Sequence, residues 1–354
     1  MTEFNWGHFG LFAVLILVSV LTVVMGFIWF ERRALARMQI RLGPNRTGPF
    51  GLLQPVADVL KVLIKEDIVP AQADKIVHWL APIVALVPAL MIFAVVPFQD
   101  GGLLADLNIG LLYVIAVSSV STLGIFMAGW GSNNKYTIIA AMRDVAAVVS
   151  YEIPLALSLV GVILVAGTMS MNGIVQEQKT IPLIFWQPLG FFIFFISGLA
   201  EINRTPFDLL EADSEIIAGF HTEYSGMKFA LFYLMEYAET LALSALVATF
   251  FLGGWQGFLL PGWLWLLLKI VLVFFVIMWI RATLPRVRID QMMSLAWKFL
   301  FPLALLNMVI TGIEVVAWPD ALPWVLIPVN IVIAAGLIIL MSRNHKTGWG
   351  RVEV

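Results

Sequence analysis

The sequence predicts an all-α polytopic membrane protein with about eight or nine transmembrane helices and one amphipathic interfacial helix. Of its 354 residues, 61% are hydrophobic, and the mean hydropathy is +0.94. These values lie above those of soluble domains, and several apolar runs reach the roughly 20 residues that a helix needs to cross a bilayer. Residues 1–354 are expected to form a single integral membrane domain, held together by helix packing in lipid.

Nine hydrophobic runs are candidate spans, and the ninth is short. The first follows an acidic N-terminus, MTEFNWGHFG, which favours a retained span over a cleaved signal peptide. The runs fall at roughly 9–30, 76–98, 111–130, 146–168, 183–202, 229–254, 263–284, 299–318 and 324–341.

The distribution of Lys and Arg predicts the orientation. Of the 21 Lys and Arg residues, all but Lys179 and Lys269 lie in the odd-to-even connections or the C-terminal tail. Because positively charged loops stay on the cytoplasmic side, the N-terminus is expected outside. The long connections, including an acidic loop at 203–228 and a basic loop at 281–298, are then expected on the cytoplasmic side.

The first long connection contains an amphipathic helix at about 52–66. Apolar residues recur there at helical spacing, and Asp58, Lys61 and Lys65 occupy the other face. Such a helix is expected to lie at the membrane interface. It either anchors the loop or forms one wall of an opening from the lipid.

The composition excludes several kinds of chemistry on this chain. There is no cysteine, hence no disulfide, thiolate nucleophile or cysteine-ligated iron–sulfur cluster. No histidine sits in the middle of a hydrophobic run, and no nucleotide-binding glycine motif is present. Neither a metal site nor a nucleic-acid partner is expected.

Carboxylates from four spans fall at bilayer depth. At 1.5 Å per residue, Glu31 and Glu201 lie at the inner ends of the first and fifth spans. Glu152 and Glu236 lie about two turns inside the fourth and sixth, with Glu239 deeper. A lone charge at such depth costs roughly 2.5–3.5 kcal/mol. The four acids Glu31, Glu152, Glu201 and Glu236 are therefore expected to face a wet interior and to titrate as a coupled set, as a proton path requires.

Residues 201–224, EINRTPFDLLEADSEIIAGFHTEY, add more acids on the same side. Thr205 and Pro206 predict the start of a helix, in which Asp208 is first of all a capping residue. The acids after it form either a solvated face or an extension of the proton path: Glu211, Asp213 and Glu215. Elsewhere, Lys269 and Glu314 lie at similar depth near the outer side. Two interpretations are possible there: the two side chains form an ion pair, or each extends separately toward the outer surface.

Four long motifs then point to a family. FERRALARMQIRLGPNRTGPFGLLQPVADVLKVLIKED, MRDVAAVVSYEIPLALS, AEINRTPFDLLEADSEIIAGFHTEYSGMKFALFYLMEYAE and RATLPRVRIDQMMSLAWKFLFPLAL closely resemble the NADH dehydrogenase subunit 1 family of respiratory complex I. This family includes the mitochondrial subunit and its equivalent in bacterial NADH:quinone oxidoreductases. The resemblance covers nearly the whole chain in matching order. Asp144 and Ala147 stand where many relatives have Ala and Gln, and Asp213 where Glu is common.

The resemblance implies a multi-pass subunit of an enzyme of the bacterial cytoplasmic (inner) membrane. In that family the subunit forms the access tunnel for ubiquinone or menaquinone and couples quinone reduction to proton translocation. FMN and the iron–sulfur clusters are expected on partner subunits, and no redox cofactor on this chain. The implied partners are antiporter-like and small membrane subunits, soluble quinone-site subunits, quinone and lipid.

The resemblance also implies roles for particular residues. Those assigned to proton coupling are Glu31, Glu152, Glu201, Asp208, Glu211, Asp213, Glu215 and Glu236. Those assigned to the quinone tunnel, its portal and its loops are Arg32, Arg41, Asp58, Phe220, Glu223, Arg281, Arg286, Arg288 and Asp290.

Three other interpretations remain open from the sequence. The chain could be the homologous subunit of a ferredoxin-, F420H2- or hydrogenase-linked complex, since the electron donor binds elsewhere. A stand-alone proton or cation transporter could use the same carboxylates, although no internal repeat is visible. A passive membrane anchor has no need for carboxylates at depth in four spans.

Overall fold

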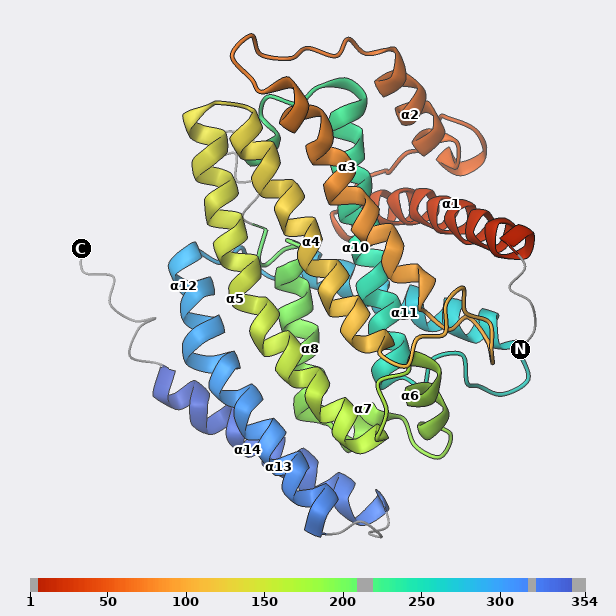
Figure 1. The fold of residues 1–354 in the computed structure, drawn as a ribbon, viewed down its shortest axis with the longest axis vertical. Coiled ribbons are helices and arrows are strands. Elements are labelled where there is room, and N and C mark those ends of the chain that lie inside the picture. Colours follow the sequence, from red (N-terminus) through yellow and green to blue (C-terminus); the bar gives the residue numbers. More distant parts are fainter. Residues whose placement is uncertain (1–5, 209–218, 318–322, 346–354) are drawn as a thin grey trace.

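The computed structural model describes residues 6–208, 219–317 and 323–345, and all regular structure in these ranges is helical. This confirms the predicted all-α fold. The helices, shown in Figure 1, are α1 (Trp6–Met38), η1 (Pro49–Gly51), α2 (Gln54–Ile64), α3 (Lys75–Met91), η2 (Ile92–Ala94), α4 (Gly110–Gly131), α5 (Lys135–Ala166), α6 (Met171–Glu177), α7 (Leu183–Trp186), α8 (Pro188–Glu201), η3 (Gly219–His221), α10 (Gly226–Phe251), α11 (Gly262–Thr283), α12 (Ile289–Leu295), η4 (Ala296–Leu300, a π-helix), α13 (Phe301–Ala317) and α14 (Pro323–His345).

Seven helices of the described residues are long and apolar enough to cross a membrane, and two shorter apolar helices accompany them. The short ones match the fifth and ninth predicted runs. The fifth run, 183–202, is wrong as a single helix because it breaks between α7 and α8. Gln187 there adopts φ −124° and ψ 64°, and the residue before a proline is kept out of the helical region by its ring.

Two helices begin earlier than the apolar runs predict. Helix α5 starts at Lys135, where the Asn134 side chain caps it by accepting from the backbone N–H of Tyr136 at 3.0 Å. Helical structure also runs from Ile289 through α12, η4 and α13, so most of the predicted basic loop 281–298 is helix. Hydropathy missed both starts because these turns carry polar side chains.

The connections gather at two ends of the bundle. At one end, Asn133 donates to the carbonyl of Gln72 at 3.1 Å, and Val287 N–H donates to the carbonyl of Pro206 at 2.9 Å. We call this the loop end. At the opposite end, Leu111 N–H donates to the carbonyl of Met169 at 3.0 Å. The predicted grouping of connections is therefore present, while the assignment of the loop end to the cytoplasm stays a prediction.

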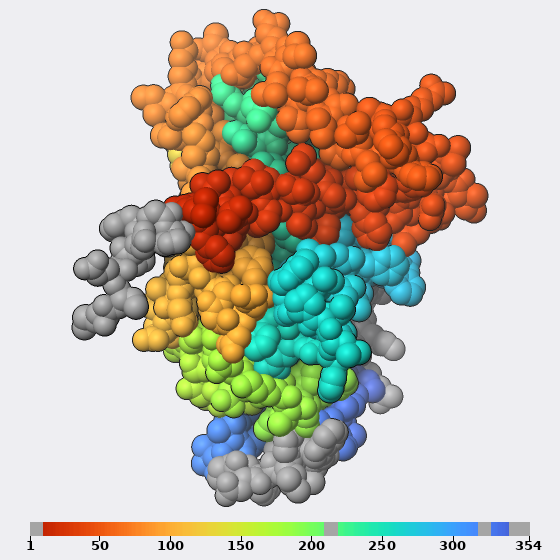
Figure 2. Space-filling view, turned by 90° about the vertical axis from the view of Figure 1, so that its right-hand side faces the viewer, coloured from red at the N-terminus to blue at the C-terminus, as the bar shows by residue number. Residues whose placement is uncertain are grey.

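The predicted amphipathic helix is α2, which is slightly shorter than the predicted range 52–66. Its apolar side chains remain open: Leu60, Leu63 and Ile64 are 55, 56 and 85% exposed. An apolar face of this kind suits a membrane interface. Figure 2 shows α1 lying across the surface beside α11, with the segment that contains α2 adjoining it.

Helix α10 lies in the middle of the bundle. It packs against α1, α2, α3 and α11, whereas α13 and α14 lie together at the edge in Figure 1. Its small residues Ala238, Ala242, Ala245 and Ala248 are at most 2% exposed. Small residues let neighbouring backbones approach closely in lipid. This packing places the acids of α10 at the centre of the molecule.

Candidate functional site

A buried ion cluster lies at the loop end of α1. Glu31 is 3% exposed and accepts hydrogen bonds from Arg204 at 3.1 and 3.3 Å, and it also pairs with Arg281. Burial alone would lower the pKa of the Arg204 guanidinium, but Glu31, followed by Tyr237 and Glu236, outweighs it. The pKa of Arg204 is therefore raised, and this buried side chain stays a cation.

A cavity of about 140 Å³ opens beside this cluster, and we call it the Arg204 cavity. The Arg204 guanidinium lies 4.3 Å from the centre of the Tyr237 ring, and the hydroxyls of Tyr233 and Tyr237 are 3.2 Å apart. Such a volume holds several waters or a polar ligand group. The cavity is lined by Asn203, Arg204, Asp208, Tyr233, Glu236, Tyr237 and Arg281.

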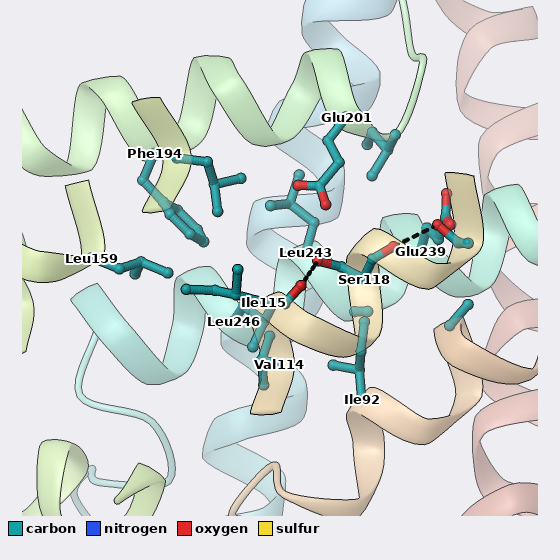
Figure 3. A pocket seen from close by; sticks show the side chains of 15 residues that line it. Ile92, Val114, Ile115, Ser118, Leu159, Phe194, Glu201, Glu239, Leu243 and Leu246 are labelled. Carbon is teal, nitrogen blue, oxygen red and sulfur yellow. Dashed lines mark hydrogen bonds between the residues drawn. The ribbon is translucent and has the colours of Figure 1, made fainter. Parts of the chain in front are cut away.

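A second cavity, of about 40 Å³, lies deeper, and we call it the Glu239 cavity. Figure 3 shows its polar lining, with Glu201 from α8, Glu239 from α10 and Ser118 from α4. The remaining walls are mostly apolar, including Leu159 and Phe194. The volume suffices for one or more waters, which need about 10–15 Å³ each. Two carboxyl groups thus share a small space with water-sized room.

Three serine hydroxyls of α4 lie beside the buried carboxyl groups. Ser119 donates to Glu152. The hydroxyls of Ser118 and Ser121 donate to backbone carbonyls of α4, and both residues line the Glu239 cavity together with Glu201 and Glu239. Because these serines lie within little more than one helical turn, the carboxyl groups of α5, α8 and α10 meet near one level of α4.

The acids form a continuous series from the loop end into the bundle. Glu31 pairs with Arg204, which also interacts electrostatically with Glu236. Glu239 lies on the same face of α10 as Glu236, three residues on, and lines the Glu239 cavity together with Glu201. Glu201 in turn interacts with Glu152. The four acids predicted at depth in four spans are therefore brought together, while their titration as a coupled set stays a prediction.

Helices α1 and α2 meet through a half-exposed ion pair. Arg32 pairs with Asp58, and Gln54 donates to the other oxygen of the same carboxylate at 3.1 Å. The hydroxyl of Thr47 donates to Oε1 of Gln54 at 2.5 Å. The pair therefore fixes the amphipathic helix against the first span, on the side of the bundle where α10 also packs.

The other predicted tunnel and loop residues divide into two groups. Phe220 is 2% exposed and packs edge-on to Phe232, and Glu223 accepts from Asn134 at 2.6 Å, so both fix the end of the acidic loop. Those that lie exposed, outside both cavities, are Arg41, Arg286, Arg288 and Asp290.

The predicted helix start at Thr205 is wrong. Residues 205–208 form a turn, with a cis peptide bond before Pro206. Phe207 packs on Tyr151 with ring centres 5.6 Å apart, and the carbonyl of Pro206 accepts from Val287. These tertiary contacts compete with a helix start at Thr205, and Asp208 lines the Arg204 cavity. The three remaining predicted acids, Glu211, Asp213 and Glu215, lie outside the described residues.

Two acids of this region were not among the predicted site residues. Glu239 is three residues after Glu236, which puts both on one face of α10, and this spacing was an available signal. Asp144 is 2% exposed on α5 and interacts with Glu239. Its role was hidden because the apolar run begins after it. The serines of α4 were also missed, although SSVST interrupts an apolar run.

The hypothesis of an ion pair between Lys269 and Glu314 is wrong. The Lys269 ammonium donates to the carbonyls of Gly254 and Gln256, both at 2.8 Å. Glu314 accepts from Asn330 at 3.2 Å. Within the described part of the chain, no group of three or more His, Cys, Asp or Glu side chains is placed to hold a metal ion.

This fold defines a helical membrane protein with several buried carboxyl groups. Residues 11–312 match the model of the NADH dehydrogenase family, and the chain belongs to this family. It is 60% identical to the H subunit of the NADH-quinone oxidoreductase of Dehalococcoides mccartyi (strain CBDB1), over the full length of both proteins.

Two further relatives have the same description. The H subunit of the Geobacillus kaustophilus oxidoreductase is 52% identical over 322 residues, which cover 89% of this chain and 96% of that protein. Its counterpart from Brevibacillus brevis is 49% identical over 320 residues, which cover 88% and 95%. The family predicted from the four motifs is confirmed.

Proposed function

We propose that this chain forms the quinone access path of an NADH:quinone oxidoreductase and carries the proton path that couples quinone reduction to proton translocation. One observation carries the proposal. The acids from Glu31 to Glu152 form an interacting series that begins at the Arg204 cavity and continues through the Glu239 cavity. The relatives named above are subunits of such an oxidoreductase.

The access path is proposed to begin beside α1, α2 and α10. The exposed apolar face of α2 gives a quinone tail a lipid-facing surface to follow. The half-exposed pair of Arg32 and Asp58 closes the contact between α1 and α2. Further in, Arg204 and Arg281 offer a cationic wall to the polar ring of the quinone.

The electrons are proposed to come from iron–sulfur clusters on soluble partner subunits that dock at the loop end, with FMN as the cofactor that meets NADH. Each quinone then takes two electrons and two protons to give the quinol. The loops 39–53, 65–74 and 284–288 lie at this end and form the docking surface. The loop end faces the cytoplasm in this proposal, and the chain resides in the bacterial inner membrane beside antiporter-like and small subunits.

Proton movement is proposed to follow the acid series. Interacting carboxyl groups take up and release protons as a set, so a change of charge at one end alters proton occupancy along the series. Arg204 ties the first member, Glu31, to the cavity where the quinone charge changes. Ser119 of α4 holds Glu152 in place, and Ser118 and Ser121 offer hydroxyl oxygens in the cavity that Glu201 and Glu239 line.

The proposal is tested in the intact complex, purified by gentle detergent extraction and returned to lipid vesicles. Glu152→Gln and Glu236→Gln keep shape but cannot carry a proton. Since a positioned proton carrier contributes typically about 10²-fold or more, coupled turnover should fall roughly 100-fold or more. Assembly should be unchanged. The matched control is Glu177→Gln, an exposed acid on α6 at the opposite end.

Two results would overturn the proposal. Normal turnover and pumping in assembled Glu152→Gln and Glu236→Gln complexes would remove the acid series from the mechanism. Recovery of the chain as an active monomer, free of iron–sulfur subunits, would favour a stand-alone transporter.

A further inference from the structure

A polar pocket lies at the opposite end of the bundle, between α13, α14 and the break that joins α7 to α8. Its volume is about 20 Å³. The side chains that line it include Gln187, Asn307 and Asn330, which are 3, 5 and 9% exposed. None of them belongs to the acid series, so the pocket is a separate feature.

Two amides of the pocket are oriented by backbone carbonyls. The Gln187 amide nitrogen donates to the carbonyl of Gly161 at 3.0 Å and to the hydroxyl of Thr311 at 3.2 Å. The Asn330 amide nitrogen donates to the carbonyl of Trp186 at 2.9 Å and to Glu314 at 3.2 Å. Reversing either amide would set oxygen against oxygen, so the carbonyl oxygens of both side chains are fixed as acceptors.

Three buried polar atoms of the pocket have no hydrogen-bond partner among the described residues. They are Oε1 of Gln187, Oδ1 of Asn330 and Nδ2 of Asn307. Two of these are acceptors and one is a donor. Buried polar groups are almost always satisfied by protein or by ordered water, because an unmade hydrogen bond in the interior costs free energy.

Gly161 lets two of these atoms converge. A Cβ atom at this position would lie 3.0 Å from Oε1 of Gln187 and 3.2 Å from Nδ2 of Asn307. Both atoms therefore approach the same point on α5, from α13 on one side and from the α7–α8 break on the other. Any larger residue at 161 would occupy that space.

We propose that this pocket binds one ordered water molecule. A water can donate to Gln187 and to Asn330 and accept from Asn307, which matches the two acceptors and one donor. The volume of about 20 Å³ exceeds the roughly 10–15 Å³ that one water needs and is less than twice the upper value. A cation fits less well, because the N–H group of Asn307 would point at it.

The water completes a hydrogen-bonded network over four helical segments. It joins Gln187, which is bonded to α5 and α13, to Asn330 of α14 and thereby to Glu314. Helix α14 packs on α7, α8 and η4. The bound water thus anchors α14 to the bundle and gives Glu314 a hydrated, neutral surrounding inside the membrane. This inference does not depend on the proposed quinone function.

The direct test is cryo-electron microscopy of the intact complex at a resolution that shows ordered waters. One density peak is expected at about 2.7–3.2 Å from all three atoms, in buffers with and without sodium. A peak that needs sodium, with the Asn307 amide reversed, would replace the water by a cation. Direct amide–amide hydrogen bonds with no peak would also overturn the proposal.

The second test asks whether the atoms share one partner. Gln187→Leu and Asn307→Leu are made singly and together, and the thermal midpoint of the complex is measured. If the two side chains share a water, the first substitution already removes it. The second substitution should then lower the thermal midpoint clearly less in the double variant than it does in the otherwise unchanged protein. Strictly additive shifts would overturn the proposal. The control combines Asn307→Leu with Ile310→Val, since Ile310 is a nonpolar residue of the same lining. The shifts in thermal midpoint of these two substitutions should be additive.

Discussion

The two ends of the helix bundle hold buried carboxyl groups in opposite ways. At the loop end, Glu31 faces two arginines, and the acids behind it interact with one another across two cavities. At the opposite end, Glu314 is bonded to the neutral amide of Asn330. Lys269, which was considered as its ion-pair partner, donates to backbone carbonyls instead.

This difference separates two uses of a carboxyl group in a membrane. A series of interacting acids exchanges protons when charge changes at one end, which suits coupling. Glu314 is instead bonded to an amide, which does not titrate, so its network suits fixed packing. Both arrangements avoid leaving a charge unpartnered in lipid.

The strongest test of the loop end is Arg204→Leu. It leaves the buried Glu31 with Arg281 alone, and breaking a buried pair costs about 3–5 kcal/mol. Less assembled complex and a lower thermal midpoint are expected. The double variant with Glu31→Gln should recover part of the loss, because the stranded carboxylate is gone. No change in the single variant would mean that the pair contributes little.

The second test compares one acid from each end. Glu239→Gln should lower coupled turnover roughly 100-fold or more, because it interrupts the series between Glu236 and Glu201. Glu314→Gln should leave turnover unchanged. The measurement is NADH-driven proton uptake by vesicles that contain the complex. Equal effects would erase the distinction between the two ends.

The third test concerns the close packing at the opposite end. Gly161→Ala adds a methyl group at 3.0 Å from Gln187 and 3.2 Å from Asn307. Overpacking of this kind costs about 1–3 kcal/mol, seen as a lower thermal midpoint. Gly336→Ala on α14 is the control, since a Cβ there meets nothing within 4 Å. A midpoint equal to that of the control would show that the pocket adapts freely.

The smallest effect on stability is expected at the pair of Arg32 and Asp58. Their side chains are 39 and 35% exposed, and exposed pairs contribute about 0–1 kcal/mol. Arg32→Gln should therefore keep the thermal midpoint but raise the KM for quinone, since it loosens α2 at the proposed entrance. Lys61→Gln, on the exposed side of α2, is the control. An unchanged KM would separate this pair from quinone access.

Much of the fold was predictable from the sequence because the bilayer imposes simple rules. Length and hydropathy located the membrane helices, and the spacing around Asp58 located α2. The same approach failed at Gln187, where one long apolar run breaks before a proline, and at Lys135, where a helix begins in polar residues. Hydropathy averages over a window and does not register a local change of backbone angle.

For the site, the sequence by itself determined which acids lie at membrane depth and on which spans, because helix rise converts residue number into depth. Only the tertiary structure decided which of them meet. Helix packing brought Glu239 and Asp144 close to the other acids, placed serines of α4 beside the buried carboxyl groups and left Glu314 with an amide. Depth is a property of one helix, whereas contact depends on the rotation and crossing of several, which one-dimensional spacing does not record.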